Sequence, residues 1–203
     1  TVTGSGRTDS GVHAIEQSAH FDCEQKIKDY KNFLKSVNFF LNKNLISILS
    51  IKKTKQIFHA RFSAKIRCYL YIIYNRDSPT SLNQNRGWYL RKRLNLNLMK
   101  KGAKKLTGTH DYSTFRSSSC GSKSPVRTII NFKITRNKDK IKIKIKSRSF
   151  LQQQVRSMVG CLKYLAEEKW DLKYFEKVFK LKKRSLCAPP APACGLFLEK
   201  VIY

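Results

Sequence analysis

Residues 140–146 read Lys-Ile-Lys-Ile-Lys-Ile-Lys, a strict alternation of cationic and apolar side chains. Because successive side chains of a β-strand point to opposite faces, this stretch predicts a strand with one apolar and one cationic face. A second run, 126–136, precedes it, and the two are separated only by Asn137-Lys138-Asp139, which is typical of a turn. We therefore predict a β-hairpin and, with it, an antiparallel sheet.

The segments on either side of this hairpin show patterns typical of both strands and helices. Apolar spacing or helix propensity predicts helices at 26–42, 96–106, 150–167 and 172–181. Alternation or enrichment in β-branched and aromatic residues predicts strands at 12–23, 45–51, 60–75 and 196–203. Residues 117–125 lack periodicity and predict a loop. This mixture indicates an α+β fold.

The chain carries a large excess of positive charge. Its 203 residues include 42 Lys and Arg against 13 Asp and Glu, a formal net charge of +29, while 41% of the residues are apolar. Length and apolar content suit one domain or two closely packed subdomains. The charge favours a polyanionic partner. No stretch approaches the roughly 20 apolar residues of a membrane-spanning helix, so we expect nucleic acid rather than a membrane.

Cysteine and histidine show no metal-binding pattern. The six cysteines lack a C-x-x-C pair, and the four histidines are scattered among them. We therefore expect no metal site. Because no secretory signal opens the chain, we expect reduced thiols and a location in the cytoplasm or an organelle matrix. The chain also begins at Thr1, without Met, so we expect further residues upstream.

Residues 6–11, Gly-Arg-Thr-Asp-Ser-Gly, place a base and an acid, Arg7 and Asp9, two residues apart between glycines. From this local sequence alone, Asp9 is best explained as a turn residue whose carboxylate caps backbone amides. The alternative is that the glycines hold an exposed carboxylate at a loop tip, with the predicted strand behind it fixing its position.

Extended to residues 6–14, Gly-Arg-Thr-Asp-Ser-Gly-Val-His-Ala, this loop resembles the signature of the TruA-type tRNA pseudouridine synthases. Four further segments resemble motifs of the same family, in the same order. They are residues 58–65 leading into 69–71, residues 108–116, residues 150–160 and residues 195–198. Five segments in order across nearly the whole chain are far more specific than any one of them.

The resemblance implies two ferredoxin-like subdomains whose antiparallel sheets meet at a basic RNA-binding cleft. The first, residues 1–56, is expected to carry the catalytic loop and to lack the family's N-terminal strand and helix. The second, residues 57–203, is expected to complete the active site. The resemblance also implies a homodimer that isomerises uridine to pseudouridine, without a cofactor, in the anticodon stem-loop of tRNA, at tRNA positions 38–40.

The same resemblance assigns catalytic roles to Asp9, Arg156 and Tyr69. Asp9 is expected to be the nucleophile, which must be ionised to attack the nucleotide or to stabilise a cationic sugar. Arg156 is expected to face Asp9 and to favour its charged form. Taken alone, Arg156 is better explained as a phosphate contact or a solvated residue. Tyr69 is expected to stack on the uracil and to help remove the C5 proton, although a core aromatic fits it and Tyr71 alike.

Arg7, Tyr69 and Leu196 are the expected substrate-binding residues. A uridine inside a stem-loop is reachable only when it leaves the base stack, and Arg7 beside the nucleophile is suited to fill the vacated space. A surface arginine explains Arg7 as well. Leu196 resembles the apolar residue that packs against the base in the family, and core packing accounts for it equally.

Six more cations are candidate phosphate contacts, although a solvated surface position explains each of them too. They are Arg61, Lys65, Arg67, Arg116, Lys123 and Arg127. Two rival functions stay open at this point. One is a catalytically inactive relative that binds structured RNA, and the other is a basic structural protein. The sequence therefore predicts a tRNA pseudouridine synthase, with these rivals to be tested.

Overall fold

The computed structural model describes residues 1–203, which form two β-sheets and four α-helices. In chain order the elements are β1 (Val2–Gly4), β2 (His13–Ala14), β3 (Ala19–Phe21), α1 (Tyr30–Leu41), β4 (Ile66–Asn75), β5 (Trp88–Leu90), α2 (Leu96–Lys105), β6 (Gly108–Asp111), β7 (Val126–Asn137), β8 (Lys140–Ser147), α3 (Gln154–Ala166), α4 (Leu172–Lys180) and β9 (Leu196–Ile202). None of the helices combines the length and apolar character needed to span a bilayer.

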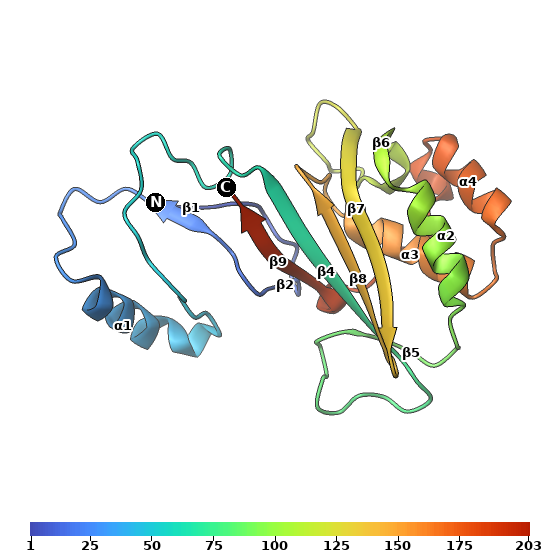
Figure 1. The fold of residues 1–203 in the computed structure, drawn as a ribbon, viewed down its shortest axis with the longest axis horizontal. Helices are drawn as coiled ribbons and strands as arrows, with labels where there is room; N and C mark the ends of the chain where they lie inside the picture. The colour runs from blue at the N-terminus through green and yellow to red at the C-terminus, as the bar shows by residue number, and fades with distance from the viewer.

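The larger sheet is built on a β-α-β-β-α-β unit, which is the ferredoxin-like arrangement. Its four main strands lie in the order β9-β4-β8-β7, and each neighbouring pair is antiparallel. Helix α2 lies between β4 and β7 in the chain, and α3 lies between β8 and β9. Both helices, together with α4, lie on one side of this sheet (Figure 1). The predicted α+β fold with antiparallel sheets is confirmed.

Three short strands extend this sheet. β2 and β5 pair in parallel with β9 and β4, and β6 pairs antiparallel with β7. Strand β2 belongs to the N-terminal part of the chain, so residues 1–56 contribute one strand to the sheet formed by residues 57–203. The division of the chain between residues 56 and 57 stays a prediction.

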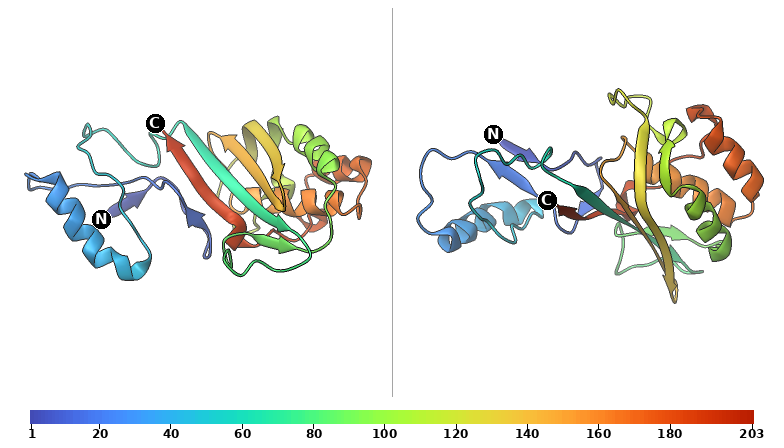
Figure 2. Two further views of the ribbon diagram at one scale, coloured as in Figure 1. Left: turned by 60° about the horizontal axis from the view of Figure 1, so that its bottom comes forward. Right: turned by 45° about the horizontal axis from the view of Figure 1, so that its top comes forward.

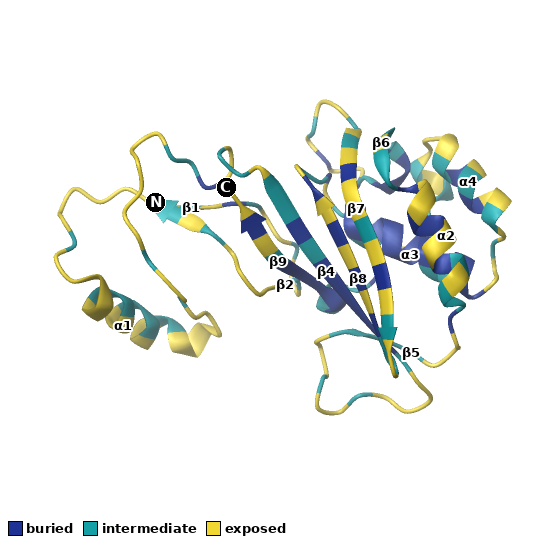
Figure 3. Ribbon diagram, in the orientation of Figure 1, coloured by how far each residue is buried: buried dark blue, intermediate teal, exposed yellow.

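The hairpin from which the sequence analysis started is confirmed as β7 and β8. Ile141, Ile143 and Ile145 are completely buried, while the lysines between them are exposed. The isoleucines pack into a core of 26 buried residues that includes Tyr71 of β4 and Met158 of α3. Figure 3 shows this alternation along β8 and the burial of α3 behind it. The helices therefore pack against the apolar face of this strand.

The remaining N-terminal residues form a separate small layer. Strands β1 and β3 pair into a two-stranded antiparallel sheet, and α1 begins after Asp29, whose carboxylate accepts hydrogen bonds from the amides of Lys31 and Asn32. No residue of α1 is buried, and Phe39 and Phe40 are strongly exposed. In every view this layer lies at the end of the molecule away from α2 and α4 (Figures 1 and 2).

Several predicted elements differ from the observed ones. The strand predicted at 45–51 is wrong, because the amide and carbonyl of Ile48 bond to the side chain of Asn38 instead of to a strand. The strand predicted at 12–23 is interrupted and becomes β2 and β3. The helix predicted from residue 150 begins at Gln154, since Gln153 has a left-handed backbone with φ of 60°. β1, β5 and β6 were not predicted, and each spans four residues or fewer.

The burial of Ile143 gives a direct test of this core. We expect Ile143→Ala to lower the free energy of unfolding by about 2–5 kcal/mol, because it removes buried methyl groups and leaves a cavity. Its neighbour Lys142 is exposed, so Lys142→Ala is the matched control and is expected to change stability by about 0.5 kcal/mol or less. Urea unfolding measures both. Equal destabilisation by the two substitutions would contradict the observation that Ile143 points into the core and Lys142 points to solvent.

Candidate active site

Asp9 lies at the tip of the loop that joins β1 to β2. The loop turns where the amide of Val12 donates to the carbonyl of Asp9, at 3.1 Å, and Gly11 supplies a positive φ of 79°. The carboxylate accepts no hydrogen bond from the backbone, and its side chain is 30% exposed. Of the two explanations left open by the sequence, the geometry matches a carboxylate presented at a loop tip rather than one that caps amides.

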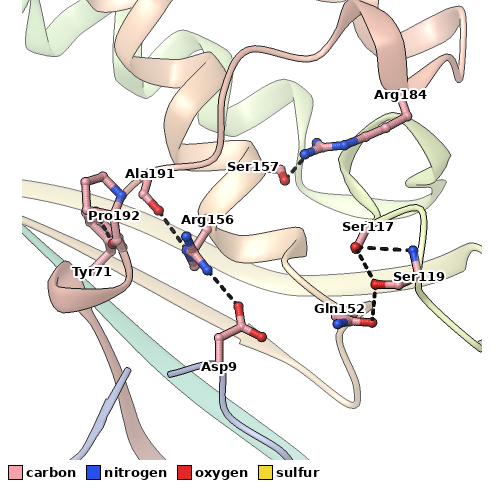
Figure 4. A network of polar contacts seen from close by, with 10 residues as sticks. All are labelled: Asp9, Tyr71, Ser117, Ser119, Gln152, Arg156, Ser157, Arg184, Ala191 and Pro192. Atoms are coloured by element: carbon pink, nitrogen blue, oxygen red, sulfur yellow. Dashed lines mark hydrogen bonds and ion pairs between the residues drawn. The ribbon is translucent and has the colours of Figure 1, made fainter. Parts of the chain in front are cut away.

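An ion pair joins Asp9 to Arg156 in the first turns of α3. Nη1 of Arg156 lies 2.8 Å from Oδ2 of Asp9, and the two residues are 147 positions apart in the chain (Figure 4). The Arg156 side chain is only 15% exposed. A guanidinium at this distance donates a charge-assisted hydrogen bond to the carboxylate and fixes its direction.

Arg156 is itself held by the segment that leads into β9. Its Nε donates to the carbonyl of Ala191 at 2.7 Å, and the amide of Ala191 donates back to the carbonyl of Arg156. The next carbonyl, that of Pro192, accepts a hydrogen bond of 2.8 Å from the buried hydroxyl of Tyr71 (Figure 4). The segment 189–195 is therefore attached both to α3 and to β4, and we call it the arginine clamp.

Two glycines allow the arginine clamp to pack this closely. A Cβ atom at Gly160 of α3 would lie 2.1 Å from the carbonyl oxygen of Pro189. A Cβ atom at Gly195 would lie 2.5 Å from the ring of Tyr71. Both distances are shorter than real contacts, so larger residues at these positions would push the clamp away from Arg156.

Tyr69 lies on the same strand face as Tyr71, two residues away, and it is half-buried. Its ring packs edge-on against Phe150, with 5.1 Å between ring centroids. Burial raises the pKa of the Tyr69 phenol; the charge of Arg67 opposes this shift and that of Asp9 adds to it. The hydroxyl is therefore protonated at neutral pH. The charge of Asp9 also acts on it, which places the two groups in the same electrostatic environment.

Arg67 holds the backbone that leads to Asp9. Its guanidinium donates to the carbonyls of Ser5, Arg61 and Arg148 at 2.7 to 2.8 Å. Burial lowers the pKa of Arg67. These bonds connect β4 to the start of the loop that carries Asp9, and the phosphate contact expected of Arg67 stays a prediction.

The other candidate RNA contacts fall into two groups. Arg7, Arg61, Lys65 and Lys123 are exposed. Arg116 and Arg127 instead donate to the backbone and to Ser122 within the loop 117–125 and hold that loop in shape. An RNA contact stays a prediction for all of them.

Leu196 belongs to the main core. It lies opposite Tyr71 in the pairing of β9 with β4 and is 7% exposed. This placement fits the core-packing explanation, and contact with a base stays a prediction. No group of His, Cys, Asp and Glu side chains comes together in a way that would hold a metal ion.

Sequence reasoning missed the residues that hold the site in place. Ala191 and Pro192 act through backbone carbonyls, which carry no signature in a sequence. A smaller network beside the ion pair links Ser117, Ser119 and Gln152 through their side chains (Figure 4). The Pro-rich stretch in which Ala191 lies was the only available signal for the clamp.

The contact between Gly160 and Pro189 tests the arginine clamp. We expect Gly160→Ala to lower the free energy of unfolding by about 1–3 kcal/mol, because the added methyl group overlaps a backbone carbonyl. Gly121→Ala is the control, since nothing lies within 4 Å of a Cβ atom there. Chemical denaturation measures both variants. Unchanged stability of Gly160→Ala would show that the clamp does not pack against α3 as described.

Comparison with known proteins places this site in a family. Residues 103–203 match the sequence profile described as tRNA pseudouridine synthase. The whole chain is 64% identical over 202 residues to tRNA pseudouridine synthase A of Pelagibacter ubique and 42% identical over 203 residues to that of Ehrlichia chaffeensis, covering 82% of each. Its identity to the Brucella ovis protein of the same name is 38% over 208 residues, covering 81%. The chain therefore belongs to the tRNA pseudouridine synthase A family.

Proposed function

We propose that this protein isomerises uridine to pseudouridine in the anticodon stem-loop of tRNA, with Asp9 as the nucleophile. Family membership supports the reaction and the class of substrate. The observation that carries the assignment to Asp9 is the ion pair with Arg156, which holds a partly exposed carboxylate in a fixed direction at the tip of a loop. The excess of positive charge suits a polyanionic substrate.

The reaction needs only what these residues supply. The bond between N1 of the base and C1′ of the sugar breaks, the uracil turns, and a new bond forms between C5 and C1′. C5 then loses its proton and N1 gains one, so that atoms and electrons balance without an oxidant or a cofactor. Asp9 supplies the negative charge that attacks the nucleotide or stabilises the cationic sugar.

Arg156 and Tyr69 complete the proposed site. Because Arg156 is fixed by Ala191, it orients the Asp9 carboxylate before the substrate arrives and keeps it in that position during the reaction. The ring of Tyr69, supported by Phe150, offers a surface on which the detached uracil stacks. Because its hydroxyl is protonated, Tyr69 relays the C5 proton and does not act as a deprotonated general base.

Substrate entry requires the target uridine to leave the base stack of the stem-loop. Arg7 is exposed, makes no hydrogen bond within the protein and lies two residues from Asp9. In this proposal its side chain occupies the space from which the uridine has turned. As the family resemblance implies, we also expect a homodimer, which sedimentation of the purified protein at several concentrations tests.

The role of Asp9 is tested by Asp9→Asn. Because the amide carries no negative charge, we expect pseudouridine formation in a tRNA transcript to fall by at least about 1,000-fold while tRNA binding is retained. The exposed Asp22 provides the matched control, Asp22→Asn, which is expected to keep full activity. Undiminished pseudouridine formation by the Asp9→Asn variant would show that Asp9 is not the nucleophile. Tight binding without product by the unsubstituted protein would instead identify an inactive RNA-binding relative.

The hydroxyl of Tyr69 is tested separately from its ring. Tyr69→Phe keeps the stacking surface and removes the proton relay, so we expect kcat to fall about 100-fold with little change in KM. Tyr174→Phe on α4 removes the hydroxyl of an exposed tyrosine and serves as the control. Steady-state assays on tRNA transcripts measure both. A Tyr69→Phe enzyme with the kcat of the unsubstituted protein would remove the hydroxyl from the mechanism.

A further inference from the structure

A polar cavity lies where β4 ends, beside the turn between β7 and β8. Its volume is about 320 Å³, and none of its lining residues is hydrophobic. Five of the lining residues are cationic and two are acidic. The cationic ones are Arg76, Arg91, Arg93, Arg136 and Lys138. We call this cavity the arginine pocket.

The scaffold of the arginine pocket is organised by Asn75, the last residue of β4. Its side-chain NH₂ donates to the carbonyls of Leu90 and Lys92 and so fixes the segment that carries Arg91 and Arg93. Its side-chain oxygen accepts from the amide of Leu94 and from Arg136. Every hydrogen-bonding group of this amide is therefore used to hold the pocket in one shape.

The positive charges of the pocket are not balanced inside the protein. Its five cations face two carboxylates, Asp77 and Asp139, which leaves an excess of three positive charges. Asp139 is paired with Arg76, at 3.2 Å, and Arg76 also donates to the carbonyls of Ser78 and Pro79. Arg91 and Arg93 form no ion pair and donate no side-chain hydrogen bond. Nε of Arg136 is buried and has no hydrogen-bond partner. The pocket therefore keeps unused donors and an excess of positive charge.

Arg136 is the cation whose charge this pocket disfavours. Burial and the nearby charge of Arg93 lower the pKa of Arg136, so each makes the charged form of this residue less favourable. A phosphate would relieve that repulsion and accept several guanidinium hydrogen bonds at once, which arginine forks are shaped to donate. A lone carboxylate side chain offers fewer acceptor oxygens and less charge.

The pocket is distinct from the proposed catalytic site. Tyr69 and Asn75 are six residues apart on β4, which corresponds to roughly 20 Å along an extended strand at about 3.3 Å per residue. A phosphate bound in the pocket therefore cannot belong to the nucleotide at Asp9. It belongs to another part of the same RNA.

We propose that the arginine pocket binds a backbone phosphate of the substrate tRNA, away from the target uridine. This inference rests on the proposed tRNA substrate, and it assigns part of the RNA interface to Arg91, Arg93 and Arg136. Such a contact adds affinity and fixes how the RNA lies, without reading its sequence.

The test is the double variant Arg91→Gln, Arg93→Gln in the full chain, with tRNA affinity measured by fluorescence anisotropy at several salt concentrations. We expect affinity to fall about 3-fold to 10-fold and the slope of log K against log salt to become shallower by about 1, as for the loss of one phosphate contact. The rate at saturating tRNA is expected to stay unchanged, because the Asp9 site is untouched.

The matched control is Lys173→Gln, Lys177→Gln, which removes the same charge from the exposed side of α4. A double arginine variant with the affinity and salt slope of this control would overturn the proposal. The proposal would also be overturned if inorganic phosphate stabilised the unsubstituted protein against unfolding but not the double arginine variant, while tRNA affinity was unchanged. The ligand of the pocket would then be free phosphate. Binding is measured without turnover, so failure of the Asp9 assignment would be seen separately in the activity of Asp9→Asn.

Discussion

The ion pair between Asp9 and Arg156 joins residues that are 147 positions apart in the chain, and the rest of the site depends on it. Asp9 lies on a loop with few backbone restraints, so its direction is set by the guanidinium of Arg156, a largely buried side chain on α3. That guanidinium is fixed in turn by Ala191 and, through Pro192, by Tyr71 in the core. The packed sheet and helices thereby determine where a surface carboxylate points.

Positive charge serves two different purposes in the structure. Arg67 and Arg127 use their guanidinium groups to hold loops by their backbone carbonyls. Arg7, Arg91 and Arg93 have no such partner and are available to a polyanion. A net charge of +29 therefore overstates the number of cations that can meet RNA, and the hydrogen bonds of each residue separate the two groups.

The sequence predicted those features that depend on local pattern. The alternation in 140–146 identified β8 and its buried face, because strand period and burial act residue by residue. It failed at 45–51, where the Asn38 side chain satisfies the backbone of Ile48 in place of a strand. The pairing of Asp9 with Arg156 came from the family resemblance alone, since no local pattern links residues 147 positions apart. The hydrogen bond from Arg156 to Ala191 was not predictable, because every residue has a backbone carbonyl and the side chain at position 191 does not reveal this contact.

The most direct test of the central role of this ion pair is the single-turnover rate of Arg156→Gln at saturating tRNA. If Arg156 orients Asp9, the rate falls by about 100-fold, the cost of a misplaced reacting group, while tRNA affinity changes less than about 3-fold. A variant that keeps its rate and loses only affinity would contradict this account. Arg156 would then be a phosphate contact, and the carboxylate of Asp9 would be positioned without it.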